Sequence, residues 1–472
     1  MNQAMLITVM AVYLVITIGI ALVIGMRKTT STADYSVGGR GFGGVILFFT
    51  MLATIVGASS VMGYTYYYYD RGIDQAWFTL GTSISYLLFV FYLGPKIHKF
   101  GVEENASTIG DWFEKRFGKT SKYISSILIV VAYIAITAFQ YIAMATIMNL
   151  ILGWNYNLCL IITAVIVIFY TSLGGLWAVA STDVIQGAMT LLGVIVMTPI
   201  LVSKAGGLSA VLSTVPATHL QVFGVVSPVA AISSTLVFAL GIVSWPDIWQ
   251  RCYAAKNTPV LKKSFVTFIV ANLVLTAMVA FLGFAAHSFY PAFEGSRNAM
   301  LPMMILENIP NFFGAIFLAS LLAVIMGTAD STLLVSAVMV EKDLLAPFIS
   351  KNQTENQRLK TGKIVTAVVG IAVLGIMFYS TEMFDLWVMS ADITGATLAF
   401  PILFGFMGRR FGGTYACLGS IILGFAGWLA SQTGLVSLEP ILFGGGLSLV
   451  AYVVLAYLEK NGVIGKEKLT AV

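Results

Sequence analysis

The chain has 472 residues, of which 58% are hydrophobic and only 10% are charged, and its mean hydropathy is +0.91. This composition excludes a soluble globular fold and is typical of a polytopic membrane protein. The net charge of +5 does not indicate nucleic acid as a partner, because the basic residues lie in short loops between apolar runs. The three cysteines are scattered and have neither disulfide nor zinc spacing.

Long apolar runs predict an all-α protein with about thirteen transmembrane helices. They cover residues 5–26, 44–69, 75–95, 123–151, 156–177, 179–203, 228–250, 264–287, 313–340, 363–380, 385–407, 413–431 and 440–458. The first run is too long for a signal peptide and follows no basic segment, so we expect a true span there. The junction near residues 173–177 is the least clearly marked.

The distribution of Lys and Arg predicts the orientation of these spans. With the N-terminus outside, 23 of the 26 basic residues fall in inner loops, and only Arg71, Lys204 and Arg297 fall outside. Such an excess is expected on the cytoplasmic side of a membrane. An odd number of spans then places the C-terminus inside, as the basic residues near it require.

Two of the predicted spans contain residues that interrupt a helix at mid-depth. Gly57, Ser59, Ser60 and Gly63 weaken the second span, and Pro246 removes a backbone donor from the seventh. These spans begin two five-span sets, two to six and seven to eleven. Paired broken segments predict an inverted-repeat transporter with its site at the membrane midplane. Ordinary kinks, satisfied by neighbouring helices, are the alternative.

Acidic residues lie in or near the spans, whereas no basic residue is expected deep within one. The acids are Asp183, Asp330 and Asp392. Unpaired acids in a membrane interior need a cation, a proton or a water-filled cavity. Asp247 and Arg251 are four residues apart at the inner end of the seventh span and can pair on one helix face.

Asp330 lies near the middle of the apolar stretch 318–343, beside the hydroxyls of Thr328, Ser331 and Thr332. A carboxylate and hydroxyls within one helical turn supply hard oxygen ligands, which suit an alkali cation. The alternative is helix packing, in which small residues allow close approach and Asp330 hydrogen-bonds across the interface.

Four sequence blocks, spread over most of the chain, resemble the sodium:solute symporter family, which includes carriers of proline, pantothenate, sugars, sialic acid and choline. The blocks are Ala33–Arg40, Gly174–Asp183, Trp245–Lys256 and Met326–Ser331. The resemblance implies thirteen spans with the leucine-transporter fold in a single membrane transport domain. Its expected parts are an extra first helix (1–30), two inverted repeats (44–203 and 228–407) and two accessory helices (413–458).

The resemblance also implies a sodium site between the second and ninth spans. The matching positions supply the carbonyls of Ala58, Val61 and Val324 and the Thr328 hydroxyl, and Gly327 occupies the position of a second hydroxyl. Gly327 stands where a serine is usual in the family, so one hydroxyl ligand is missing. This site must therefore be weaker, completed by water or rearranged.

Some family members bind a second sodium near an acid in the sixth span. The matching residues here are Asp183, Asp330 and Ser331, which we interpret as a second sodium site or a proton site. Asp330 replaces a common serine, a variant also found in choline-type carriers. Ile55 stands where those carriers have a cage tryptophan, which argues against choline.

These features predict a sodium-coupled symporter of the cell membrane that imports a small organic solute by alternating access. Its expected partners are Na⁺, the solute and the lipid bilayer. The substrate-binding candidates, chosen by their position between the broken spans, are Ser60, Tyr64, Gln140, Trp245 and Asp392. The rings of Tyr64 and Trp245 could enclose a quaternary ammonium, although packing explains them equally well. No arginine of the kind that fixes sialic acid is found, only Gln140.

Two other functions stay open at this level. Coupling to protons, carried by Asp330 or Asp183, is the nearest alternative. A sensor or channel without uphill transport is the second, although the 14 residues after residue 458 are too few for a signalling domain. No catalytic constellation indicates an enzyme, and no feature indicates nucleic acid or an obligatory protein partner.

Overall fold

The computed structural model describes residues 3–349, 353–377 and 384–464. Within these ranges every regular element is helical, and one isolated bridge joins Phe42 to Ala255. Ten of the described helices are long and apolar enough to cross a membrane, or up to eleven when one bent pair is counted as a span. The prediction of an all-helical polytopic membrane protein is confirmed for these residues. Residues 378–380, predicted to end one span, lie outside them.

The first half of the chain forms nine helices within the described residues. They are α1 (Gln3–Lys28), α2 (Thr32–Val37), α3 (Gly44–Ile55), α4 (Tyr64–Arg71), α5 (Ala76–Leu88), α6 (Gly94–Glu103), α7 (Ile109–Phe117), α8 (Lys119–Leu152) and α9 (Tyr156–Lys204). The second half continues with α10 (Leu208–Thr214), α11 (Pro228–Gly241), α12 (Pro246–Ala254), α13 (Thr258–Phe289), α14 (Met300–Asn308), α15 (Asn311–Met339), α16 (Ala346–Ile349), α17 (Glu355–Met377), α18 (Phe384–Gly405), α19 (Thr414–Gln432) and α20 (Pro440–Lys460).

The helix α9 is too long to be a single span. Its 49 residues would extend for about 73 Å as one straight helix, more than twice the ~30 Å apolar thickness of a bilayer. Gly175 interrupts it with φ 58° and ψ −158°, and a Cβ at this position would lie 2.5 Å from Tyr35 Cδ2. Only glycine combines this backbone conformation with so close a neighbour. The break falls at the weakly marked junction between the fifth and sixth predicted runs.

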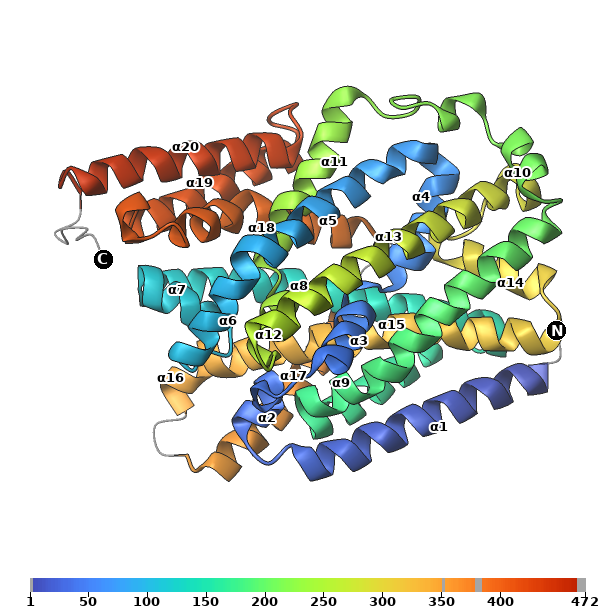
Figure 1. Cartoon of the computed structure of the whole chain (residues 1–472), viewed down its shortest axis with the longest axis horizontal. Helices are drawn as coiled ribbons and strands as arrows, with labels where there is room; N and C mark the ends of the chain where they lie inside the picture. The colour runs from blue at the N-terminus through green and yellow to red at the C-terminus, as the bar shows by residue number, and fades with distance from the viewer. Residues whose placement is uncertain (1–2, 350–352, 378–383, 465–472) are drawn as a thin grey trace.

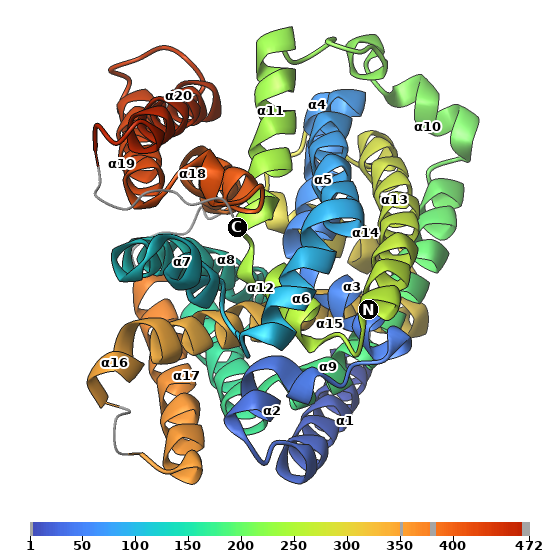
Figure 2. The same cartoon turned by 60° about the vertical axis from the view of Figure 1, so that its left-hand side comes forward.

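The helix α15 lies at the centre of the bundle, and the long helices run in broadly similar directions (Figure 1). It packs against α8, α9 and α3, while α1 lies along α9 at one edge of the molecule. The pair α19 and α20 packs beside α18 at another edge (Figure 2). Large apolar side chains such as Val15, Phe91 and Val270 are exposed on outward faces, as expected for helices that contact lipid. The buried centre therefore belongs to α15 and the helices around it.

Candidate functional site

The second predicted span is broken where α3 gives way to α4. Val56 leaves the helical region (φ −87°, ψ 89°), and the chain resumes a wide helical turn before α4 begins. The Ala58 amide donates a hydrogen bond to Gln140 Oε1 of α8 (3.1 Å). A Cβ on Gly57 would lie 2.5 Å from Thr328 Oγ1. Glycine at this position therefore lets the broken backbone approach α15 directly.

The seventh predicted span is broken between α11 and α12, which are bent by 46°. Trp245 is extended (φ −72°, ψ 112°), and Pro246 begins α12. The Trp249 indole donates to the Val243 carbonyl (2.9 Å) and so satisfies a backbone group near the break. Both predicted helix breaks are present.

A small cavity lies between the two breaks. Its lining residues are Ile55, Ser60, Tyr64, Thr82, Tyr86, Trp245, Asn272, Thr276 and Trp387. Apart from the aliphatic Ile55, this lining consists of aromatic rings and neutral polar groups, and no charged side chain contributes to it. The cavity volume of about 20 Å³ leaves room for about one water molecule. An organic solute can therefore occupy it only after the surrounding helices move apart.

Three of the five predicted substrate-binding residues, Ser60, Tyr64 and Trp245, meet in this cavity. The other two lie elsewhere. Gln140 is fully buried on α8, where it holds the Ala58 amide. Asp392 lies on α18 near Trp428 of α19 and does not line the cavity.

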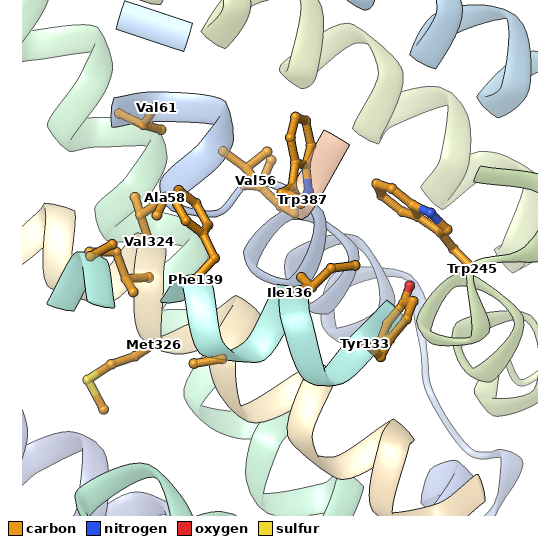
Figure 3. Packing of buried hydrophobic residues seen from close by; sticks show 14 of the residues in the cluster. Val56, Ala58, Val61, Tyr133, Ile136, Phe139, Trp245, Val324, Met326 and Trp387 are labelled. Atoms are coloured by element: carbon orange, nitrogen blue, oxygen red, sulfur yellow. The ribbon is translucent and has the colours of Figure 1, made fainter. Parts of the chain in front are cut away.

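The residues of the first predicted sodium site gather where α15 meets the break in the second span. Ala58, Val61 and Val324 are buried on one side of this break, and Trp245 lies on the other (Figure 3). Thr328 Oγ1 donates a hydrogen bond to the Ala53 carbonyl (3.1 Å). The structure therefore brings buried residues of the break and of α15 together, with the Thr328 hydroxyl and without a charged side chain among them.

Close packing accounts for the glycine at residue 327. A Cβ there would lie 2.8 Å from Ala53 Cβ and 3.0 Å from Gln186 Oε1. A serine would have to displace one of these neighbours before its hydroxyl could reach an ion. Residue 327, which lacks the hydroxyl ligand of the family pattern, is thus also a position where α15 approaches α3 and α9 closely.

The structure distributes the second predicted group, Asp183, Asp330 and Ser331, over two clusters. Asp183 Oδ2 accepts a hydrogen bond from Thr50 Oγ1 (2.5 Å) and lies 3.7 Å from Arg251 Nη2. Arg251 Nη2 also donates to Ser331 Oγ (2.7 Å). Two of the three predicted residues are therefore joined through a buried guanidinium.

Asp330 faces a different partner. Its Oδ2 accepts a hydrogen bond from the Tyr170 hydroxyl of α9 (2.8 Å). Within the described part of the chain, Oδ1 of Asp330 and Oδ1 of Asp183 have no hydrogen-bond partner. The two acids lie near enough to interact electrostatically. The centre of the bundle thus holds two buried acids, of which only Asp183 has a cationic side chain within ion-pair distance.

The prediction that no basic residue lies deep within a span is wrong for Arg251, and its predicted pairing with Asp247 does not form. The Arg251 side chain is 1% exposed and turns toward Asp183. Asp247 instead accepts hydrogen bonds from the Tyr133 hydroxyl (2.7 Å) and the Ile248 amide (2.8 Å). The physical reason is that neighbouring helices offer the guanidinium a carboxylate and several hydroxyls, whereas its own helix offers one carboxylate that already has other donors.

Ion pairs join α7, α8 and the helical turn Val340–Leu345 that follows α15. Lys122 Nζ lies 2.9 Å from Glu114, 3.3 Å from Asp111 and 3.5 Å from Asp343. Burial opposes ionisation of Asp111, but a hydrogen bond from the Ser107 amide and the nearby Lys122 charge hold the pKa of Asp111 below its ordinary value. These contacts fix three helices at one end of the bundle.

Sequence reasoning missed several residues that the structure places at the centre. They are Thr50, Thr54, Thr82, Tyr86, Asn272, Thr276 and Trp387. A usable signal existed for two pairs. Thr50 and Thr54, like Asn272 and Thr276, are polar residues four apart in an otherwise apolar run, which places them on one helix face.

Comparison with known proteins gives consistent sequence matches. The profile of the sodium:solute symporter family matches residues 35–424. The osmoregulated proline transporter OpuE of Bacillus subtilis is 26% identical over 480 residues, which cover 96% of each chain. The sodium/pantothenate symporter of Escherichia coli is 26% identical over 460 residues, which cover 94% of each chain.

Solved structures show the same fold. A sodium-coupled sialic acid symporter in a substrate-bound outward-open state superposes with a TM-score of 0.84 at 18% identity, over 96% of this chain and 98% of the other. The nucleobase-cation-symport transporter Mhp1 in a closed conformation superposes with a TM-score of 0.63 at 16% identity, over 94% and 97% of the two chains. The arrangement of the helices is therefore that of known secondary transporters.

Proposed function

The chain belongs to the sodium:solute symporter family, and we propose how its buried residues carry out the sodium-coupled symport that this membership establishes. It is a membrane transporter of the cell membrane and not an enzyme, and Na⁺ is its coupling ion. One Na⁺ that crosses ~100 mV releases ~2.3 kcal/mol. A tenfold sodium gradient adds ~1.4 kcal/mol. Together these terms support accumulation of the solute by a few hundredfold per sodium.

The proposed topology has thirteen spans, with the N-terminus outside and the C-terminus inside. The length of α9 supports two spans there, and α3 with α4 supports one broken span. Spans two to eleven then form two inverted repeats of five (44–203 and 228–407), each beginning with a broken helix. Residues 1–30 add a first helix, and residues 413–458 add two accessory helices.

The proposed coupling ion binds where Thr328 faces the broken second span. The carbonyls of Ala58, Val61 and Val324 and the Thr328 hydroxyl supply its ligands, and Gly327 leaves one position to water. The close approach of Gly57 to Thr328 Oγ1 supports this placement. Neutral oxygens bind Na⁺ reversibly, because no fixed charge holds the ion in place. Bound Na⁺ would tie α15 to the break, and its release would let the repeats move apart.

The proposed solute site is the cavity between the two breaks. Ser60, Tyr64 and Trp245 would contact the solute there, and Gln140 would act indirectly by holding the Ala58 amide. Asp392 would contact the solute only after α18 moves. A lining without charged side chains favours a solute of no net charge, such as a zwitterion, over an anion.

Asp183, Asp330 and Ser331 are proposed to form a second cation centre, distinct from the first sodium site. Oxygens from α9 and α15 supply it, Arg251 lies beside Asp183 and Ser331, and a sodium ion or a proton could balance the remaining charge of Asp330. Coupling to protons alone is the competing hypothesis for this centre.

The observation that carries the proposal is the contact of Thr328 with the broken second span, next to the cavity between both breaks. Uptake into proteoliposomes tests it. We expect an inward Na⁺ gradient to drive uphill uptake of L-proline more strongly than of pantothenate, the solutes of the two relatives. Uptake driven by a pH gradient without Na⁺ would instead support proton coupling. Equilibration without accumulation would support a channel or sensor.

A further inference from the structure

Two histidine rings meet at one end of the bundle, away from the sodium and solute sites. His219 belongs to the loop formed by residues 215–227, which joins α10 to α11, and His287 lies in the last turn of α13. The centroids of the two rings are 5.4 Å apart. The Tyr69 ring of α4 stacks on His287 with a centroid separation of 4.4 Å. The two histidines thus form a contact between a loop and the end of a long helix.

Each histidine ring has a nitrogen atom that the protein leaves unsatisfied. His219 Nδ1 and His287 Nε2 are buried, and neither has a hydrogen-bond partner among the described residues. The His287 residue as a whole is only 8% exposed. The Tyr69 backbone hydrogen-bonds the His287 ring, and this bond falls to Nδ1 because Nε2 has no partner. The lone pair of Nε2 is then available to a ligand.

The chemistry and spacing of these nitrogens suit a transition-metal ion. Neutral imidazole binds zinc, copper and nickel ions, and a ligating histidine usually bonds a carbonyl through its other nitrogen, as His287 does. An ion ~2.1 Å from one nitrogen of each ring would place the ring centroids about 5 Å apart, close to the observed 5.4 Å. Among the described residues no third His, Cys, Asp or Glu completes the group. Water would therefore fill the other coordination positions, unlike in the closed zinc sites that hold a fold together.

The loop that carries His219 is anchored to the outer half of the broken second span. Asp74, which follows α4, accepts hydrogen bonds from the backbone amides of Phe223 (2.8 Å) and Val225 (2.9 Å). Gly72 has φ 58°, and the His219 carbonyl leaves no room for a Cβ there. The loop thus passes directly over the end of α4 (Figure 1). His219 is held to the first proposed repeat, whereas His287 belongs to the second.

We infer that His219 and His287 form a site for a divalent transition-metal ion of the zinc type, which clamps the loop 215–227 to α13. Bound metal would join two repeats that must move relative to each other, and so would slow transport. The metal site itself does not depend on the proposed function. Its place on the outer face and its effect on transport rest on the proposed topology and on alternating access.

Metal binding to the purified protein tests the site without knowledge of the solute. Full-length protein without a polyhistidine tag is titrated in detergent with ZnCl₂ by calorimetry, with MgCl₂ as the control. We expect one Zn²⁺ per chain and no binding of Mg²⁺ at this site, because Mg²⁺ prefers oxygen ligands. His219→Ala and His287→Ala should each weaken Zn²⁺ binding by at least ~10-fold, since even the loss of a residue that orients a ligand costs that much.

The third histidine of the chain provides a matched control. His98 is also buried, but its Nδ1 lies 3.0 Å from the Cys252 carbonyl, so His98→Ala should leave Zn²⁺ binding unchanged. The three cysteines are buried and stay in every variant, so any Zn²⁺ bound by thiols would persist in both variants of the pair. A thermal unfolding scan without metal shows which variants are folded. His219 lies in a loop and is partly exposed, so His219→Ala should fold even if His287→Ala does not.

Limited proteolysis tests the clamp. Leu220 and Phe223 are exposed in the loop, so chymotrypsin can cut there. Zn²⁺ should slow this cleavage in the wild type and not in His219→Ala. In proteoliposomes, external ZnCl₂ should slow uptake driven by Na⁺ in the wild type, and EDTA should restore it.

The outcomes separate this inference from the proposed function. A wild type that binds no Zn²⁺, or a folded His219→Ala variant that binds it as tightly as the wild type, would overturn the metal site. Bound Zn²⁺ that leaves cleavage of the loop or uptake unchanged would overturn the clamp. If Na⁺ drives no uptake at all, the proposed function fails, while the titration and the proteolysis still decide the metal site and the clamp.

Discussion

The two faces of α15 differ in the charge of the groups that they meet. At Thr328 the helix faces a broken backbone and offers neutral oxygens only. One residue beyond Asp330, at Ser331, the helix faces a carboxylate, two threonines and a buried guanidinium. The first face has no fixed charge, whereas the second contains a charge and its partner.

This difference matters because a coupling ion must leave as readily as it binds. A site of neutral oxygens holds Na⁺ without a strong Coulombic trap, so small movements of the helices can release the ion. A carboxylate in a low dielectric binds a cation far more tightly. In this chain the Arg251 guanidinium lies 3.7 Å from that carboxylate, Asp183.

The largest effect is expected for Asp183→Asn. This change leaves the Arg251 charge buried without its anionic partner, which typically costs about 3–5 kcal/mol. The midpoint of thermal unfolding of the purified protein should fall steeply. In a double-mutant cycle, Arg251→Gln in the same chain should recover part of the loss, because the unpaired charge is removed. Strict additivity of the two changes would show that the pair does not interact.

The next largest effect is expected on the side of α15 at Thr328, which offers only neutral oxygens. Thr328→Ala removes the one hydroxyl ligand of the proposed sodium site, in which Gly327 stands where the family usually has a serine. Losing one such contact to a charged ligand costs about 1.5–3 kcal/mol, which corresponds to about a 10- to 100-fold higher Na⁺ requirement. The sodium dependence of uptake, or of thermal stabilisation by NaCl relative to KCl, measures it. Thr328→Ser keeps the hydroxyl and should stay near wild type; an unchanged sodium requirement in Thr328→Ala would remove Thr328 from the site.

A smaller effect is expected for Gly327→Ser, which restores the family residue. The new Cβ would meet Ala53 and Gln186 at 2.8–3.0 Å, so we expect a loss of stability of about 1–3 kcal/mol. Gly327→Ala reports this packing cost without a hydroxyl. The serine variant should bind Na⁺ more tightly than the alanine variant. Equal sodium affinities in the two variants would mean that residue 327 faces away from the ion.

Local sequence signals predicted much of this architecture. Apolar runs gave the helices, and Gly57 and Pro246 marked both breaks, because glycine and proline act on the backbone wherever they stand. The position of Thr328 against the second span came from the family resemblance. The helices and their breaks could be predicted without knowing which helix faces touch.

The partners of Arg251 and the rest of the cavity lining, beyond Ser60, Tyr64 and Trp245, escaped prediction for the opposite reason. Helical spacing relates Arg251 to Asp247 on its own helix, but its partners lie on α3, α9 and α15, and the bend at Trp245 decides which of them it meets. Likewise Asn272 and Thr276 share a face of α13, yet the sequence does not say whether that face turns to lipid or to the cavity. The direction in which a helix face points depends on how the helices pack together in the tertiary structure.

The smallest effect is expected for Asp330→Asn, which shows whether Asp330 depends on the Arg251 charge as Asp183 does. Asp330 accepts a hydrogen bond from Tyr170, and an asparagine oxygen can accept the same bond, so we expect a loss of no more than about 0.5–1 kcal/mol. Thermal unfolding of this variant beside Asp183→Asn gives the measurement. If the two variants lose equal stability, the guanidinium balances both acids together, and Arg251 is the counter-ion of the whole cluster and not of Asp183 alone.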